Sequence, residues 1–307
     1  MRSVDATLPP VPGIASADVL IDRSARTRFR LGFDRAMGWL TPLLFLVAIV
    51  PILDMVYYVS LKAVPHLTWT IITGTNPYEA NVYLGVPLYT TFYVIGLATA
   101  IAVALGLFGG IATAELLPEQ WANAARTGAN LLVGTPSIII GYLGYLGFVL
   151  YFGWGPVFIA GVVTLSFFMT PYVFRTADLA FSSIPRHIRE AALGSGAGPS
   201  QYIVRVGLPI AFPQVLTGVF LAMAIGIGET APLVVTMQPG VLVPQNLFSP
   251  AKTLTMVIWE NFQSPLAANQ VLAFEAAFLL LVIVLALNVV VRVISARYQK
   301  RLEGLYQ

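Results

Sequence analysis

Residues 190–209 read E-A-A-L-G-S-G-A-G-P-S-Q-Y-I-V-R-V-G-L-P and lie between long apolar segments. The stretch is small-residue-rich, polar and interrupted by glycine. Serine can cap a helix and proline fits its first turn, whereas glycine permits the positive φ of a sharp turn. The sequence therefore predicts two short helices joined by a turn, the second ended by a proline. The residues that suggest these boundaries are Ser183, Pro185, Gly194, Gly196, Gly198, Pro199, Ser200 and Pro209.

The composition around this stretch is that of a membrane protein. The chain is 57% hydrophobic and 10% charged, with a mean hydropathy of +0.80, whereas soluble domains carry about 25% charged residues. The basic residues flank apolar runs and form no single patch, so we expect lipid contact and no nucleic-acid partner. The absence of cysteine excludes disulfides and thiolate chemistry.

Apolar runs long enough to span a bilayer, about 20 residues each, occur six times. This pattern predicts an all-α polytopic membrane protein with six transmembrane helices and with both termini on the same side. We expect a tail over 1–36, a membrane domain over 37–295 with a polar loop at about 179–210, and a tail over 296–307. The predicted spans are 37–61, 86–115, 130–152, 156–178, 211–236 and 271–295.

The distribution of basic residues predicts the orientation in the cell membrane. Of 17 Lys and Arg residues, only Lys62 and Lys252 fall outside the segments assigned to one common side, which the positive-inside rule places in the cytoplasm. Both termini and the 190–209 stretch are then cytoplasmic. The outer loop 237–270 either lies on the membrane surface, touches an external partner, or is a packed connection.

The spacing E-A-A-x-x-x-G, nine residues, then I-x-L-P resembles the EAA loop of ABC-importer permease subunits, with Val206 in place of isoleucine. The resemblance implies the MetI-like permease fold of type I ABC importers. It also implies that the loop forms coupling helices that dock on a separate ATPase. The matching residues are Glu190, Ala191, Ala192, Gly196, Leu208 and Pro209.

The chain lacks the phosphate-binding signature G-x-x-x-x-G-K-[ST]. ATP and Mg are therefore expected at the partner ATPase, with no cofactor on this chain. No nucleophile and base occur in a catalytic arrangement, so we expect a transporter subunit and not an enzyme. His66 and His187 are predicted on opposite sides of the membrane, which argues against a metal site.

Three further runs resemble the PstA-type permeases of phosphate importers, over about residues 85–295. They are G-T-P-S-I at 134–138, T-P-Y-V-F-R-T at 170–176 and I-G-E-T-A-P-L at 227–233. The resemblance implies phosphate import with a PstC-like permease, a PstB-like ATPase dimer and a PstS-like binding protein. Alternatives are an ABC permease for sulfate, molybdate or phosphonate, an ion-driven secondary transporter, and a membrane scaffold or sensor.

Intramembrane charges mark the candidate substrate path, because they are costly in lipid. Arg175 and Asp178 share one helix face, and arginine suits bidentate contact with an oxyanion. PstA-type permeases carry such a pair on the proposed phosphate path, usually with Glu as the acid. Alternatively, Arg175 only reaches the headgroups.

Glu229 and Thr230 belong to the second candidate region, inside the predicted fifth span. A carboxylate there must be paired, protonated or in contact with water. Glu229 either forms an ion pair with Arg175, accepts the proton of hydrogen phosphate, or bonds to a neighbouring helix for packing alone. Thr135 and Ser137 are weaker candidates for hydroxyl contacts with an anion.

Overall fold

The computed structural model describes residues 25–76 and 82–303, and every regular element in these ranges is a helix. The chain divides into two units, Met1–Tyr58 and Val59–Gln307. Residues 1–24 of the predicted N-terminal tail and 304–307 of the C-terminal tail lie outside the described residues. The remaining tail residues are helical, because α1 (Ala25–Ala63) and α12 (Ala267–Glu303) extend past the apolar runs.

Five helical stretches in the described residues are long and apolar enough to cross a membrane. They are Met37–Ala63, Gly85–Glu115, Phe158–Ser182, Pro199–Ile227 and Ala267–Ile294. Two of these stretches coincide with α3 (Gly85–Glu115) and α6 (Phe158–Ser182), and two are parts of α1 and α12. In the remaining one, α8 (Pro199–Tyr202) and the π-helical turn η4 (Ile203–Gly207) run directly into α9 (Leu208–Ile227).

The predicted third span at 130–152 is not one continuous helix in the structure. Helix α4 (Glu119–Gly134) is followed by α5 (Ser137–Gly144) and the π-helical turn η3 (Tyr145–Tyr151), and the two parts are bent by 102°. Thr135 at the bend has an extended conformation, as expected for a residue before proline. Only if this bent pair counts as one crossing does the number of spans reach six.

The predicted fifth span is also interrupted. Helix α9 ends at Ile227 and α10 (Ala231–Thr236) follows with Pro232 in its first turn. At the other end of α9, Pro209 lies in the first turn, where proline is tolerated. The prediction that Pro209 ends a helix is therefore wrong: the second short helix continues into the span.

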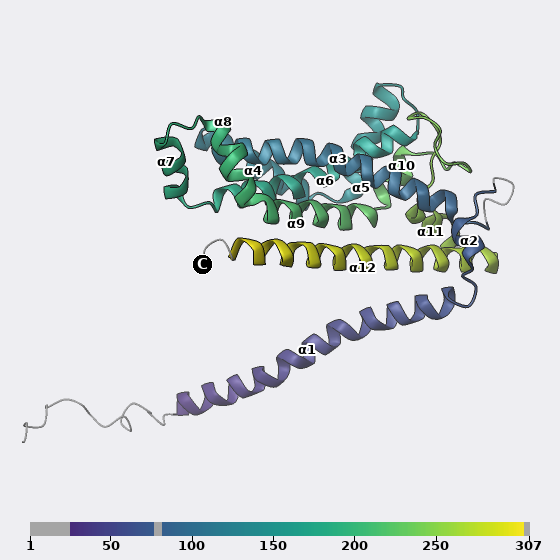
Figure 1. Cartoon of the computed structure of the whole chain (residues 1–307). Helices are drawn as coiled ribbons and strands as arrows, with labels where there is room; N and C mark the ends of the chain where they lie inside the picture. Colours follow the sequence, from purple (N-terminus) through teal and green to yellow (C-terminus); the bar gives the residue numbers. More distant parts are fainter. Residues whose placement is uncertain (1–24, 77–81, 304–307) are drawn as a thin grey trace, which may run out of the picture. The chain divides into compact units, whose positions relative to one another are not determined.

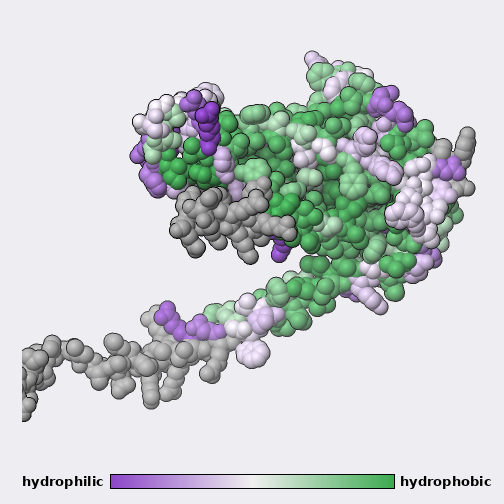
Figure 2. Space-filling model, viewed as in Figure 1, coloured by the Kyte–Doolittle hydropathy of each residue, from purple (hydrophilic) through white to green (hydrophobic). Residues whose placement is uncertain are grey.

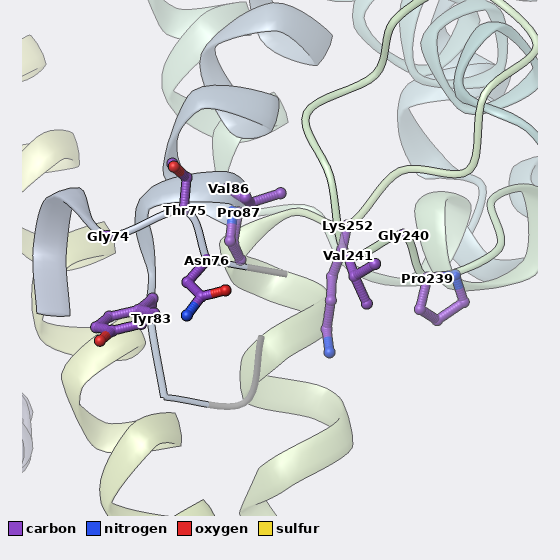
Figure 3. Close-up of a pocket in the computed structure, with 10 residues that line it drawn as sticks. All are labelled: Gly74, Thr75, Asn76, Tyr83, Val86, Pro87, Pro239, Gly240, Val241 and Lys252. Carbon is purple, nitrogen blue, oxygen red and sulfur yellow. The ribbon is translucent and has the colours of Figure 1, made fainter. Parts of the chain in front are cut away.

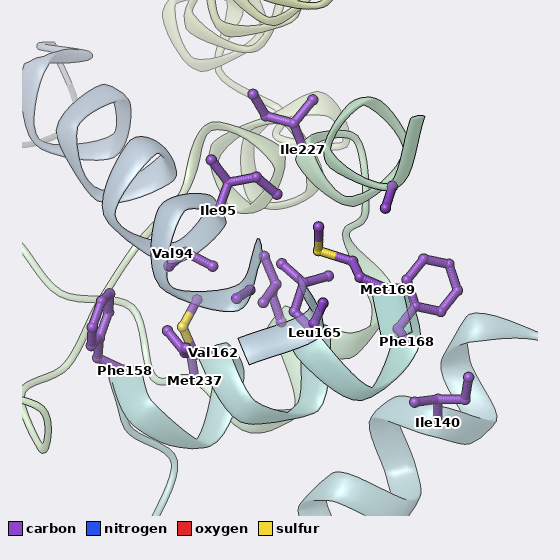
Figure 4. Packing of buried hydrophobic residues seen from close by; sticks show 14 of the residues in the cluster. Val94, Ile95, Ile140, Phe158, Val162, Leu165, Phe168, Met169, Ile227 and Met237 are labelled. Atoms are coloured by element: carbon purple, nitrogen blue, oxygen red, sulfur yellow. The ribbon is translucent and has the colours of Figure 1, made fainter. Parts of the chain in front are cut away.

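Helices α3 and α6 form the centre of the larger unit (Figure 4). Val94 and Ile95 of α3 pack with Leu165 and Met169 of α6, and Ile227 of α9 joins the same cluster. Burial of each such side chain stabilises the fold by about 1.5–3 kcal/mol when water is the alternative. In lipid the gain comes mainly from close packing.

Two glycines let α3 approach α6 closely. A Cβ at Gly106 would lie 2.7 Å from the Cβ of Val173, and one at Gly110 would lie 2.6 Å from the Cβ of Ala177. These distances are too short for any side chain to fit without a shift of the backbones. The small residues therefore allow the two helices to pack closely along their C-terminal halves, as small residues do in other membrane helix pairs.

Different short helices lie at the two ends of this unit. Helix α7 (Arg186–Gly194) and α8 lie at one end of the long helices, and α2 (Trp69–Thr73) and α11 (Leu254–Phe262) lie at the other (Figure 1). The sides between them are mostly apolar (Figure 2), as lipid or protein contact requires. The loop 237–270 contains α11, which is packed through Leu254 and Val257, although Trp259 is 61% exposed. This favours the packed connection among the alternatives for that loop.

Candidate functional site

The predicted helix–turn–helix is present as α7, a turn and α8. Helix α7 begins after Pro185 and places no residue in the core. Gly196 has φ +91° in the turn, a conformation that other L-residues rarely adopt. Ser183 does not cap α7, because its hydroxyl donates to the carbonyl oxygen of Ala180 at the end of α6 (2.8 Å).

The residues predicted to couple the permease to an ATPase fall into two groups. Glu190, Ala191 and Gly196 are exposed on the hairpin, and Ala192 is half-buried. Leu208 packs against the cluster formed by α3, α6 and α9, and Pro209 is exposed one residue later. The first group is available to a docking partner, whereas Leu208 anchors the hairpin to the membrane helices.

A cluster that sequence reasoning missed fixes this hairpin to α3. Glu115, the last residue of α3, forms an ion pair with Arg189, in which Arg189 Nε lies 3.2 Å from Glu115 Oε2. The Nη2 atom of Arg189 donates to the backbone oxygen of Glu115 (3.2 Å), and the Tyr202 hydroxyl donates to Glu115 Oε1 (3.4 Å). The Arg189 guanidinium also lies 6.0 Å from the centre of the Tyr202 ring. Three helices, α3, α7 and α8, therefore meet at one carboxylate.

A chamber of about 490 Å³ lies beside the C-terminal half of α6, and its volume is within the usual size range of small-molecule sites. Two arginines and one acid contribute its charge. The residues that line it are Arg126, Asn130, Phe174, Arg175, Asp178, Leu179 and Ser182.

The prediction that Arg175 and Asp178 act together needs correction. Asp178 is 5% exposed and forms a bidentate pair with Arg126 of α4, with Nε–Oδ2 and Nη2–Oδ1 distances of 2.8 Å. Arg175 is exposed in the same chamber, and no acid among the described residues pairs with its guanidinium. Because Arg126 neutralises Asp178, the chamber retains one positive charge, that of Arg175.

Glu229 lies in the break between α9 and α10 and is half-buried. Its carboxylate accepts a hydrogen bond from Ser137 at the start of α5, and its carbonyl oxygen accepts one from Thr255 of α11 (3.1 Å). No ion pair joins Glu229 to Arg175 in this structure. Thr230 follows as the residue before α10, and its carbonyl oxygen accepts the Leu233 and Val234 amides. The hydroxyl of Thr135, a candidate for contact with an anion, donates a hydrogen bond to the Leu131 carbonyl oxygen.

At the opposite end, Lys252 lines a small pocket of about 50 Å³ (Figure 3). Residues around 74–76, 83–87 and 239–241 surround it. Its Nζ atom pairs with Glu260 of α11 at 2.5 Å, so this cation is neutralised within the chain. No group of His, Asp and Glu suited to a metal occurs among the residues that the structure describes.

An all-helical membrane body with an exposed two-helix hairpin at one end defines the class: a multi-pass permease subunit of an ABC importer. The chain belongs to the family described as "Binding-protein-dependent transport system inner membrane component", whose model matches residues 105–303.

Relatives from three bacteria match the chain over most of its length. The chain is 30% identical to "Phosphate transport system permease protein PstA 2" of Mycobacterium bovis over 98% of this chain and 96% of the relative. It is 32% identical to "Phosphate transport system permease protein PstA" of Haemophilus influenzae over 75% and 82%. It is 30% identical to "Probable ABC transporter permease protein YqgI" of Bacillus subtilis over 80% and 89%. The likeness to the mycobacterial relative extends into the N-terminal segment, beyond the predicted 85–295.

Solved structures support the fold alone. A chain of a bacterial alginate ABC transporter in complex with an alginate-bound periplasmic protein matches with TM-score 0.63 at 15% identity, over 87% of this chain and 98% of that chain. A chain of the MetNI methionine ABC transporter, in an inward-facing conformation, matches with TM-score 0.58 at 17% identity, over 69% and 94%. The expected type I importer permease fold is thereby confirmed.

Proposed function

We propose that this chain is the PstA-type permease of a phosphate importer and that it provides half of the translocation pathway. An anionic cargo is supported by the chamber described above, because Arg175 is exposed and unpaired there while Arg126 neutralises Asp178. A guanidinium in such a place suits the bidentate recognition of an oxyanion. The choice of phosphate is supported by the names of the relatives in M. bovis and H. influenzae.

Glu229 belongs to the same proposed path. An ionised carboxylate repels a phosphate dianion, but hydrogen phosphate carries a proton that a carboxylate can accept as a hydrogen bond. Sulfate carries no such proton at neutral pH. The contact with Ser137 holds the carboxylate at the break between α9 and α10, where Thr230 adds a hydroxyl.

The proposed assembly contains a second, PstC-like permease, two PstB-like ATPases that bind ATP and Mg, and a PstS-like external binding protein. The family description, which names a binding-protein-dependent system, supports the external partner. The exposed Glu190, Ala191 and Gly196 of the hairpin would contact the ATPase. With the basic residues inside, the hairpin and both termini face the cytoplasm.

The docking role is tested by Ala191→Arg, which places a long cation on the small-residue face of α7. We expect the variant to insert at wild-type level but to lose the ATPase on co-purification and to lose uptake, since a close helix contact cannot accommodate the side chain. Normal recruitment of the ATPase would refute docking through this face.

The cargo is tested by uptake of labelled phosphate into proteoliposomes that contain the full complex, with sulfate, molybdate and a phosphonate as competitors. We expect only phosphate and its close analogue arsenate to compete, and uptake to require ATP. Inhibition by sulfate or molybdate at equal concentration would assign another oxyanion. Uptake that persists with an inactive ATPase would instead indicate an ion-driven carrier.

A further inference from the structure

Helix α7 is weakly attached to the membrane helices except at one position. It contributes no buried residue, and Ile188 is its partly buried contact with the cluster around α3, α6 and α9. Arg189, next in sequence, makes the ion pair and the backbone hydrogen bond with Glu115 described above. The side chain of Glu115 is only 5% exposed, so this contact is shielded from solvent on one side.

We propose that Glu115, Arg189 and Tyr202 form a mechanical link that transmits the displacement of the coupling hairpin to α3. The inference rests on the proposed function, because it takes the hairpin as the docking site of an ATPase. Without this link, α7 is joined to the membrane helices through the chain, by 183–185 to α6 and by 195–198 to α8. With this link, a displacement of the hairpin also displaces the C-terminal end of α3.

The direction of transmission follows from the packing of α3. At Gly106 and Gly110, α3 packs against Val173 and Ala177 of α6 so closely that no side chain would fit between the helices. Arg175 lies on α6 between these two contacts. A force applied at Glu115 therefore reaches the segment of α6 that carries Arg175 through the packing of α3 against α6. This route adds to the direct connection of the hairpin to α6 along the chain.

The chemistry of the link favours a fixed connection over a sliding one. An ion pair with additional hydrogen bonds to Oε1 and to the backbone oxygen of Glu115 constrains orientation as well as distance. Apolar contacts such as that of Ile188 allow sliding at little cost. Arg189 is thus a positioning residue, which acts on the transport path through α3 and does not touch the cargo.

The first test uses the assembled complex in proteoliposomes with Arg189→Gln, Glu115→Gln and the exchanged pair Glu115→Arg/Arg189→Glu. Arg205→Gln is the matched control, since Arg205 is an exposed arginine of η4. We expect the single variants to retain the ATPase and its hydrolysis but to lower phosphate uptake per ATP by about tenfold, a coupling loss of ordinary size. The exchanged pair should recover most of the ratio, as coupled partners do.

Three results would overturn the link. They are an unchanged ratio in both single variants, loss of the ATPase from Arg189→Gln, which would make Arg189 a docking residue, and no recovery in the exchanged pair.

The second test does not depend on the cargo. The chain has no cysteine, so spin labels at Ser195→Cys in the turn and Leu116→Cys after α3 report one distance. In the wild-type complex we expect this distance to stay constant when ATP is added, and in Arg189→Gln to change or broaden. The same distances in both proteins would refute the link, whereas failure of phosphate uptake in the wild type would refute the cargo alone.

Discussion

Arg175 and Asp178 lie three residues apart, yet the structure gives them different partners. Local spacing placed both on one face of α6, and this was sufficient to bring both to the chamber. It could not reveal Arg126, which lies 52 residues away in the sequence and meets Asp178 because α4 packs on α6. The sequence therefore identifies charges that need an explanation but not which of them remain unpaired.

Substitution of the free arginine tests the chamber. Arg175→Gln should lower phosphate uptake by at least about tenfold, because a hydrogen bond to a charged group contributes about 1.5–3 kcal/mol. Arg175→Lys should retain part of the activity, since lysine keeps the charge but loses the planar fork. Uptake by proteoliposomes measures both, with Arg292→Gln near the end of α12 as the control for an exposed arginine at a membrane surface. Equal uptake in Arg175→Gln and Arg292→Gln would mean that Arg175 only reaches the headgroups.

The paired arginine should affect stability instead. Arg126→Ala leaves the buried Asp178 carboxylate without its partner and should lower the free energy of unfolding by about 3 kcal/mol. The double variant Arg126→Gln/Asp178→Asn should recover most of this loss, because two neutral amides can hydrogen-bond. Thermal unfolding in detergent measures both, with Arg205→Ala as the control. A double variant no more stable than Arg126→Ala would argue against the pair as the cause.

Glu229 provides a residue-scale test of the path. Glu229→Gln keeps the size of the side chain and its contact with Ser137 but removes the charge, and we expect slower phosphate uptake at normal membrane levels. The companion variant Ser137→Ala keeps the carboxylate and loses the hydroxyl, so it separates the effect of the charge from that of the contact. Wild-type uptake by Glu229→Gln would assign the residue to helix packing.

At the scale of elements, the long apolar runs predicted the four spans in α1, α3, α6 and α12 to within a few residues, because lipid requires a fixed helix length. They did not predict the breaks at 135–136 and 228–230. Proline signals were present at Pro136 and Pro232, but many membrane helices continue through proline when neighbours satisfy the backbone. Only the packing of α5 against α10 decides that these helices bend and end.

The contact of α3 with α6 can be tested by adding a methyl group. Gly110→Ala places a Cβ 2.6 Å from the Cβ of Ala177 and should destabilise the protein by about 1–3 kcal/mol through overpacking. Gly96→Ala is the matched control on the same helix, because nothing lies within 4 Å of its added Cβ. Unfolding midpoints in detergent compare the two. Equal midpoints would mean that the helices separate easily.

At the scale of the whole molecule, the positions of the basic residues predict the orientation. In intact cells, a membrane-impermeant thiol reagent should label Gln263→Cys after α11 and leave Ser195→Cys unlabelled, because the positive-inside rule places the hairpin in the cytoplasm. Inverted vesicles should give the reverse pattern. The cysteine-free background ensures that each label reports one site. Labelling of Ser195→Cys in sealed cells would reverse the proposed topology.

Helix α7 is nine residues long and has no side chain in the core, and a helix of this length is marginal in water by its own hydrogen bonds. Its backbone amides should exchange with solvent deuterium much faster than those of α6, and more slowly once an ATPase covers them. Part of the free energy of that contact is spent on ordering the helix. For the proposed docking of an ATPase on α7, the association would then be weaker than its contact area suggests, which suits a junction that must rearrange in every transport cycle.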